Sequence, residues 1–383
     1  MMEPEIIQRF LESVGKKADV DLYLKLFRAQ KKESFAIISA DAQIVKSALD
    51  PFHFDLRILA GLGLIPVVLL GLDGAREADR QAQRVHEWLV EDAVPARVLS
   101  AGNGMSGDAI DTVRATIAEG AIPLLSLEAA KETNADARVR MLGTLAASLD
   151  TRKLIFLSRG AGLGPRASRP LSVVNLGADY DTLVAGGTLS RRQNMLLRQV
   201  KQLLDQVPHR LSVAVVNPLQ LLRELFTVSG AGTLIRRGSR IETRAGWTDV
   251  DQPRLRALFH SAFGKTLRPD FFDTPVERTY IEESYLGAAV IREAPVGIYL
   301  TKFAVERHAQ GEGIGGEVWS VMVRDFPTFF WRARPANPIN PWYANQCDGM
   351  ARFPDWHVFW RGLPLERIDP AVRYAIGEPT DLV

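Results

Sequence analysis

The sequence predicts two domains, an α/β domain with a parallel-rich sheet followed by an α+β domain. Three observations support this. The chain has 383 residues, too many for one typical core. Short apolar runs alternate with helical patterns as far as about residue 235, whereas a helix and then mostly strands follow. The stretch 230–249 between them is rich in Gly and Arg, so we expect domains over residues 1–240 and 241–383.

Buried parallel strands appear in a sequence as short, nearly continuous apolar runs. Helical patterns at 106–120, with Ser106 as N-cap, and at 191–207 supply crossover connections between such strands. We therefore expect a sheet with helices on both faces. Its predicted strands are SFAIIS (34–39), LIPVVLLG (64–71), AIPLLSL (121–127), KLIFLS (153–158) and SVAVV (212–216).

The second domain begins with a predicted helix near Asp251, whose Leu255, Leu258 and Phe259 share one face. One further helix is expected from about residue 314. The remaining elements indicate a mostly stranded α+β domain. The predicted strands are 278–282, 285–293, 296–305, 329–334 and 356–363.

Composition narrows the class of protein. Lys+Arg 47 and Asp+Glu 45 give a net charge of +2, so no nucleic-acid or membrane partner is expected, although a small anionic substrate stays open. The single Cys347 allows no intramolecular disulfide and fits no zinc-ligand spacing, so no metal is expected.

No apolar run reaches the roughly 20 residues of a bilayer span, and the N-terminus lacks signal or transit character. We expect a cytoplasmic protein.

A glycine-rich turn, QGEGIGGEVW, follows the apolar strand that ends at Val305 and precedes a predicted helix. Glycines let backbone N–H groups converge, and a helix N-terminus adds positive potential, so the turn fits a phosphate cradle. Taken alone, it fits a structural loop equally well. Its spacing matches the Q-x-x-G-x-G/A signature and resembles the GCN5-related N-acetyltransferases. That resemblance implies acetyl-coenzyme A binding by Phe303, Val305, Gln310, Gly311, Gly313, Gly315 and Gly316.

Longer strings are similar to the vertebrate-like N-acetylglutamate synthases and the bacterial bifunctional N-acetylglutamate synthase/kinases. Two upstream strings, VNLGADYDTLV (174–184) and ELFTVSGAGTLIRRG (224–238), resemble their amino-acid-kinase domain. The likeness covers most of the chain. The strings that resemble the acetyltransferase domain are FGKTL (263–267), YLTKFAV (299–305), QGEGIGG (310–316) and FFWRARPANPINPWY (329–343).

The resemblance implies acetyl transfer from acetyl-coenzyme A to the α-amino group of L-glutamate, in arginine biosynthesis. It implies that Tyr343 gives a proton to the departing thiolate while Asn337 orients the amine or the tetrahedral intermediate. The pair lies in ANPINPWY (336–343), whose prolines predict one rigid turn. Two candidates remain for the general base, a water relay toward Tyr299 and an acidic side chain.

Three cations, Lys265, Lys302 and Arg334, match family positions that bind the carboxylates of glutamate. Taken alone, each of these residues could equally be a solvated surface cation. Lys302 is less easily explained in this way, because it lies in an apolar strand and a buried cation needs a partner. The same resemblance puts Tyr299, Leu300 and Phe303 beside the substrate and the thioester carbonyl. Trp342, Trp356 and Trp360 are interpreted as packing residues.

The first domain resembles an amino-acid kinase that has lost its phosphate site. Its first strand and turn, AIISADAQIV (36–45), lack the expected Lys and glycines, and Asp73 in GLDGAR (71–76) opposes phosphate binding. The resemblance implies that this domain assembles a homo-oligomer and carries a site for the effector L-arginine. The alternative is that the domain is retained only for folding and association. Two other activities stay open for the chain, a bifunctional synthase/kinase and a non-catalytic arginine-sensing subunit.

Overall fold

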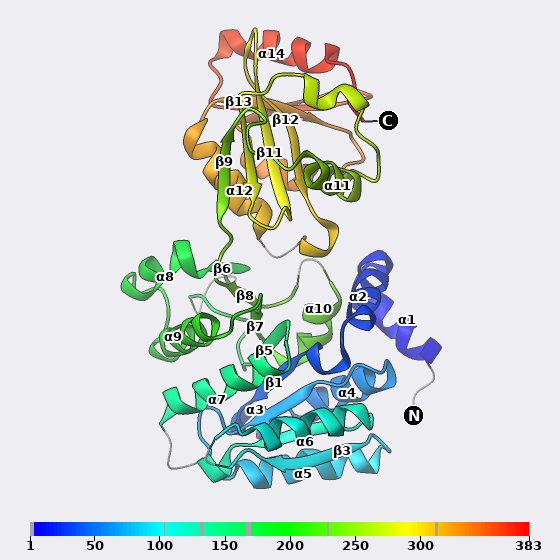
Figure 1. Cartoon of the computed structure of the whole chain (residues 1–383), viewed down its shortest axis with the longest axis vertical. Helices are drawn as coiled ribbons and strands as arrows, with labels where there is room; N and C mark the ends of the chain where they lie inside the picture. The colour runs from blue at the N-terminus through cyan, green and yellow to red at the C-terminus, as the bar shows by residue number, and fades with distance from the viewer. Residues whose placement is uncertain are drawn as a thin grey trace. The chain divides into compact units, whose positions relative to one another are not determined.

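Two compact units make up the chain in the computed structural model, Met1–Gly238 and Ser239–Val383 (Figure 1). The structure describes residues 4–102, 104–130, 134–165, 170–227, 230–310 and 313–382. The division lies two residues before the boundary expected from the sequence. Each unit has its own sheet and its own buried apolar core.

The first unit is built around a sheet in the order β3-β4-β2-β1-β5-β7-β8-β6. Its strands are β1 (Ile37–Ala40), β2 (Val67–Leu70), β3 (Ala96–Ser100), β4 (Ile122–Ser126), β5 (Lys153–Leu157), β6 (Val173–Asn175), β7 (Ser212–Val216) and β8 (Thr233–Arg236). Its helices are α1 (Pro4–Val14), α2 (Lys17–Ala29), α3 (Ala42–Ser47), α4 (Leu49–Gly61), α5 (Ala78–Glu91), α6 (Gly107–Ala118), α7 (Ala135–Ser148), α8 (Leu176–Ala185), α9 (Arg191–Gln206) and α10 (Leu221–Phe226).

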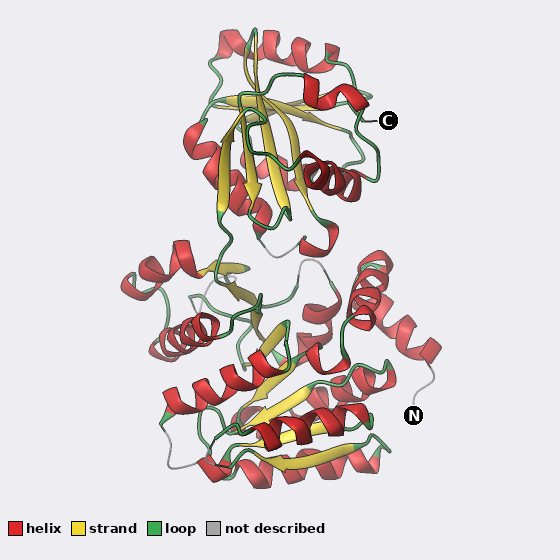
Figure 2. Cartoon of the chain, in the orientation of Figure 1, coloured by secondary structure: helices red, strands yellow, loops and turns green. Residues whose placement is uncertain are grey.

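Neighbouring strands of this sheet run parallel except β7 and β8, which are antiparallel. Every residue of β1, β2 and β4 is buried, because helices cover both faces of the sheet (Figure 2). The predicted α/β class is confirmed. The predicted apolar runs contain β2, β4, β5 and β7, and the first run covers β1 except for Ala40. The prediction missed β3, an edge strand that is half-exposed or exposed, β6, which has only three residues, and β8, which lies in the stretch expected to be a domain connection.

The second unit holds a sheet in the order β14-β15-β13-β12-β11-β10-β9. Its strands are β9 (Ile241–Ala245), β10 (Arg278–Glu282), β11 (Gly287–Ala294), β12 (Gly297–Val305), β13 (Phe329–Ala333), β14 (Gly349–Arg352) and β15 (His357–Arg361). Its helices are α11 (Gln252–Phe263), α12 (Ile314–Asp325), α13 (Asn340–Gln346) and α14 (Leu365–Gly377).

This second sheet is antiparallel except between β12 and β13. Alternate residues of β11 enter cores on opposite faces. Ala289 and Ile291 join the core that contains residues of α12, whereas Ala288 and Val290 join the core that contains residues of α11. The predicted α+β class is confirmed.

Two local expectations differ from the structure. The stretch 230–249 is not only a connection, because β8 and β9 both run through it. ANPINPWY is not a single rigid turn, because helix α13 begins at Asn340. Pro341 stands in the first turn of that helix, where its missing N–H costs no helical hydrogen bond. Across the described ranges, no helix combines the length and apolar composition that crossing a bilayer requires.

Asp55 of α4 is a buried carboxyl in the first unit. Its side-chain Oδ2 has no hydrogen-bond partner among the described residues, and burial raises the pKa of Asp55 to about 8. An unfolded aspartate has a pKa of about 3.9, so between these two values the folded chain holds a proton that the unfolded chain releases. Folding stability is therefore lost as pH rises from about 4 toward 8.

Replacing Asp55 with Asn should remove this pH dependence. At pH 8 we expect the free energy of unfolding to rise by more than about 1 kcal/mol, because the folded chain no longer has to bury a charge or take up a proton, whereas at pH 4 it should change little. Urea denaturation of the full chain at both pH values measures the effect. Asp21→Asn, an exposed substitution on α2, is the control. An equal effect of Asp55→Asn at both pH values would contradict the burial argument.

Candidate active site

The candidate site lies where β12 and β13 stop pairing. The two strands pair only at Tyr299–Phe330 and Leu300–Trp331, although β12 continues to Val305. Beyond Leu300 the backbone of β12 has no partner on β13. N–H and C=O groups left unpaired in this way need a ligand, water or another partner. The gap between the strands is therefore suited to binding a molecule through the backbone.

Thr301 is an extra residue in β12. Consecutive residues of β11 pair with Leu300 and Lys302, so Thr301 has no partner there and forms a β-bulge. The bulge changes which side chains share a face. Leu300 and Phe303 both join the core that contains residues of α12, and Tyr299 joins the core that contains residues of α14. Side chains from both faces of the sheet thus reach the same gap.

A cavity of about 170 Å³ is present at this gap. The structure brings together around it every residue predicted for acceptor binding or catalysis, namely Lys265, Tyr299, Leu300, Lys302, Phe303, Arg334, Asn337 and Tyr343. It also adds lining residues that the sequence did not predict, among them Arg292, Trp331, Arg332, Trp356, Glu378 and Asp381.

Tyr343 is the buried phenol of the cavity. It lies on α13 and packs edge-on against Trp331, with ring centroids 5.5 Å apart, and against Phe359 at the same separation. Burial raises the pKa of Tyr343 above its ordinary value. The phenol is therefore neutral at pH 7 and carries a proton that it can donate.

Asn337 and Asn340 use their amides differently. The Oδ1 of Asn337 accepts from the Ile339 N–H at 3.3 Å, which leaves its Nδ2 donor for a ligand. The Nδ2 of Asn340 donates to the carbonyls of Arg334 and Pro335 at 2.9 and 3.0 Å. Asn340 therefore ties the start of α13 to the chain that leaves β13.

Arg334 presents a cation to the cavity. Its guanidinium lies over the Trp356 ring at 3.9 Å and donates to the Asp355 carbonyl at 3.3 Å. Arg332 lies over the same ring, also at 3.9 Å. Among the described residues, no ion pair joins either guanidinium to a carboxylate. Trp356 is thus a lining residue that orients two arginines, which corrects its interpretation as packing alone.

Lys302 is a buried cation with a partner. Only 6% of it is exposed, and its Nζ contacts the carboxylate of Asp381 and the carbonyl of Thr301. Burial lowers the pKa of Lys302, and the Asp381 carboxylate opposes that shift. The sequence shows that a lysine in this strand needs a partner, but Asp381 is 79 residues away in the chain and no local pattern identifies it. Lys265, by contrast, is exposed at the cavity.

The glycine-rich turn follows β12. The Nε2 of Gln310 donates to the carbonyl of Val305 at 3.3 Å, which fixes the turn to the end of the strand. Gly311 lies outside the described residues. Gly313 is the N-cap of α12 and has a φ of 82°, in the left-handed region that favours glycine.

Gly315 and Gly316 occupy the first turn of α12. A Cβ on Gly315 would lie 3.2 Å from Cγ2 of Val305 and 3.5 Å from the Phe303 ring, so glycine lets the helix pack closely on β12. The Cβ position of Gly316 faces open space. The first N–H groups of a helix have no partner within it, and its N-terminus carries positive potential. The turn therefore offers hydrogen-bond donors to an anion.

In the first unit, an ion-pair cluster lies at the turns after β1 and β2. Arg192, near the start of α9, contacts Asp41 at 2.6 Å and Asp73 at 3.4 Å. Asp41 also caps α3 by accepting from the Ile44 N–H. The carboxyl ends of these parallel strands carry acidic side chains, which repel phosphate.

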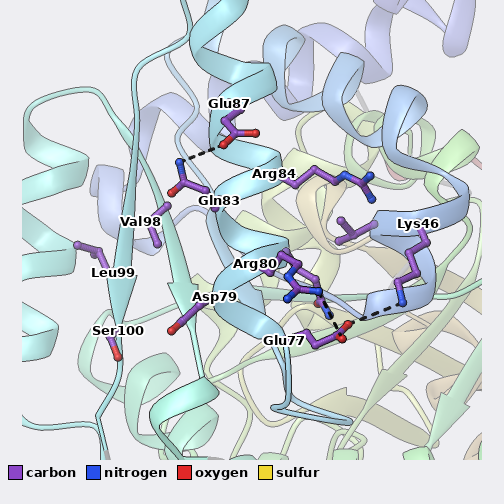
Figure 3. A pocket seen from close by; sticks show the side chains of 12 residues that line it. Lys46, Glu77, Asp79, Arg80, Gln83, Arg84, Glu87, Val98, Leu99 and Ser100 are labelled. Atoms are coloured by element: carbon purple, nitrogen blue, oxygen red, sulfur yellow. Dashed lines mark hydrogen bonds and ion pairs between the residues drawn. The ribbon is translucent and has the colours of Figure 1, made fainter.

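A wider hollow of about 930 Å³ lies in the first unit between α3, α5 and β3 (Figure 3). Glu77 pairs there with Lys46 at 3.8 Å and with Arg80 at 3.7 Å. These charges satisfy one another, and all residues predicted for catalysis lie in the second unit. Within the described residues, no group of three or more His, Cys, Asp or Glu side chains is arranged to hold a metal ion.

Known proteins resemble both units. A sequence family described as the N-acetyltransferase of N-acetylglutamate synthase matches residues 241–377. An acetylglutamate kinase of Xanthomonas campestris pv. campestris is 31% identical, over 94% of this chain and 98% of the relative. The mitochondrial N-acetylglutamate synthase of Mus musculus is also 31% identical, over 86% of this chain and 70% of the relative.

A solved structure supports the fold of the whole chain. The N-acetylglutamate synthase from Neisseria gonorrhoeae, complexed with coenzyme A and N-acetyl-glutamate, has a TM-score of 0.53 at 16% identity, over 90% of this chain and 97% of that one. The sequence relatives extend over both units at 31% identity. The chain therefore belongs to the family of N-acetylglutamate synthases and acetylglutamate kinases, which join an amino-acid-kinase domain to an N-acetyltransferase domain.

Proposed function

We propose that the second unit transfers the acetyl group of acetyl-coenzyme A to the α-amino group of L-glutamate, as a step of arginine biosynthesis. The observation that carries this proposal is the composition of the cavity between β12 and β13. It combines Arg334 and Lys265, two cations without a carboxylate partner among the described residues, with the amide of Asn337 and the buried phenol of Tyr343. A dicarboxylic amino acid complements the cations, because guanidinium and ammonium groups bind carboxylates.

The reaction needs few groups from the protein. The acceptor's ammonium group first gives a proton to water, and its nitrogen then attacks the thioester carbonyl carbon. A C–N bond forms, the C–S bond breaks, and the nitrogen's second proton, carried by water, replaces the one that Tyr343 donates. Tyr343 gives its proton to the departing sulfur, while the Nδ2 of Asn337 donates a hydrogen bond to the acceptor or to the tetrahedral intermediate. Unpaired backbone of β12 after Leu300 supports the thioester.

We place the pyrophosphate of acetyl-coenzyme A at the N-terminus of α12. The donors of the first turn, at Gly315 and Gly316, support this assignment, together with the tie from Gln310 to Val305. Phe303 and Val305 of β12 then flank the cofactor's path into the cavity. The bound coenzyme A in the Neisseria gonorrhoeae synthase is the matching precedent.

A bifunctional synthase/kinase is the second candidate, because relatives matching nearly all of this chain are named acetylglutamate kinases. Asp41 and Asp73 argue against it, since phosphoryl transfer needs cations and backbone donors around the phosphates. We infer that the first unit instead supports a homo-oligomer and binds L-arginine. A second Neisseria gonorrhoeae synthase structure, complexed with coenzyme A and L-arginine, has a TM-score of 0.52 at 16% identity.

One assay on the purified full chain tests these activities. With acetyl-coenzyme A we expect free thiol to appear only when L-glutamate is present, and with N-acetylglutamate and ATP we expect no ADP. ADP production would establish the bifunctional alternative. An absence of glutamate-dependent thiol release would contradict the synthase proposal and leave the regulatory-subunit alternative. Repeating the thiol assay with added L-arginine tests the effector site.

Tyr343→Phe should lower kcat by about 100-fold, because it removes the proton donor but keeps the ring that packs on Trp331 and Phe359. The melting temperature should change little. Tyr280→Phe is the control, since that buried tyrosine hydrogen-bonds Asp325 away from the cavity and should keep its kcat. A near-normal rate in Tyr343→Phe would remove the phenol from the mechanism.

Arg334→Lys should raise KM for L-glutamate about tenfold and alter KM for acetyl-coenzyme A little. Lysine keeps the charge but loses both the planar fork and the stacking over Trp356. The control is Arg352→Lys on β14, an exposed arginine that does not line the cavity. Steady-state kinetics with each substrate varied distinguishes the outcomes, and equal KM values in both variants would argue against carboxylate binding by Arg334.

A further inference from the structure

Arg334 and Trp356 face each other at the end of a strand pair. Ala333 and His357 form the last pair of β13 and β15, and Trp356 directly precedes His357. The antiparallel register therefore puts Arg334 and Trp356 in opposite positions. Arg332 lies two residues before Arg334, so its side chain leaves the strand on the same face. This register explains why both guanidiniums lie 3.9 Å from the centre of the Trp356 ring.

The Trp356 ring is held by the hairpin that carries it and by Arg332. β14 and β15 pair as far as Arg352 and His357, and the Phe353 N–H donates to the Trp356 carbonyl at 2.8 Å. The Arg332 guanidinium is fixed in turn, because it donates to three carbonyls at 2.6, 2.6 and 3.0 Å, in the last turn of α14 and just after it. The indole is therefore a rigid platform at the cavity wall.

Arg334 keeps most of its donors for a ligand. Its carbonyl accepts from the Nδ2 of Asn340 at 2.9 Å, and its Nη1 donates to the Asp355 carbonyl at 3.3 Å. Among the described residues, its Nε and Nη2 donate to no other group. Contact with an aromatic face uses none of these N–H groups. The ring therefore orients the plane of the guanidinium and leaves its hydrogen-bonding edge to the cavity.

A second cation of the cavity is fixed by different means. Lys302 is only 6% exposed, and its Nζ contacts the Asp381 carboxylate and the Thr301 carbonyl. Lys265 is instead exposed on a flexible side chain. Two cations held in place set a fixed spacing for the two carboxylates of an acceptor that binds both.

We propose that Trp356 is a positioning residue that determines which dicarboxylic amino acid the cavity accepts. By holding Arg334 at a fixed place relative to Lys302, it makes the cavity select L-glutamate over L-aspartate. L-Aspartate is shorter by one methylene, so its carboxylates do not reach both fixed cations together. Without the ring, Arg334 is free to follow the shorter acid. This inference rests on the proposed acetyl transfer to glutamate.

Trp356→Leu tests the inference, because it removes the aromatic face and keeps an apolar side chain. We expect KM for L-glutamate to rise about tenfold and the ratio of kcat/KM for L-glutamate to that for L-aspartate to fall about tenfold. KM for acetyl-coenzyme A should stay within about twofold. Trp356→Phe keeps a weaker face and should recover part of the selectivity. Trp360→Leu is the matched control, since that half-buried tryptophan of β15 does not line the cavity.

A double-mutant cycle distinguishes positioning from general support of the fold. In the wild type, Arg334→Lys should lower the glutamate-to-aspartate ratio, whereas in Trp356→Leu it should change that ratio little, because the ring acts through Arg334. Two independent, multiplying losses would overturn the inference, as would an unchanged ratio in Trp356→Leu.

Two further outcomes are decisive. Should Trp356→Leu fail to fold, Trp356→Phe must show a smaller fall of the same ratio, coupled in the same way to Arg334→Lys, or the inference is wrong. A wild-type chain that acetylates neither amino acid would overturn the proposed function and this inference with it. A wild type that acetylates L-glutamate and L-aspartate equally well would overturn this inference alone.

Discussion

The early end of pairing between β12 and β13 is the constraint on which the candidate site depends. The parallel pair of β12 and β13 is only two residues long. The rest of β12 therefore has no backbone partner on β13, although the sheet is otherwise continuous. The bulge at Thr301 adds to this effect, because it changes the faces to which the following side chains point. Side chains from both faces of one sheet can therefore line a single cavity.

Aromatic packing supplies the rigidity that this opening removes. Trp319 lies within contact of Trp331, Trp342 and Phe303, and Tyr343 completes the cluster from α13. Among the described residues no side chain or backbone group hydrogen-bonds the Tyr343 phenol, so the surrounding rings set its position by shape. The polar groups of the cavity are instead fixed by backbone contacts, such as those that Asn340 makes.

The sequence was most informative where burial was complete. Continuous apolar runs revealed β1, β2 and β4, and a lysine within an apolar strand indicated a buried cation at Lys302. Edge strands such as β3 keep one side exposed and therefore lack that signal. The prolines of ANPINPWY predicted one rigid turn, but a proline in the first turn of a helix produces the same local pattern as a turn.

Residues contributed by distant segments were hidden from the sequence. Asp381 lies close to Lys302 only because the chain after α14 returns to the cavity and is bridged to Leu267. Trp356 has no motif of its own, and its role comes from Arg332 in β13 and Arg334 directly after that strand. Periodicity identifies faces of single elements, but it does not identify which faces meet.

The contact of Arg332 and Arg334 with the Trp356 ring also has an optical consequence. Both guanidiniums lie 3.9 Å from the indole, which is half-buried and lines the cavity. An anion that draws Arg334 toward itself changes the electric field at this ring. Tryptophan emission is sensitive to such fields, so the indole is a built-in fluorophore positioned to report the arrival of a carboxylate ligand without any added label.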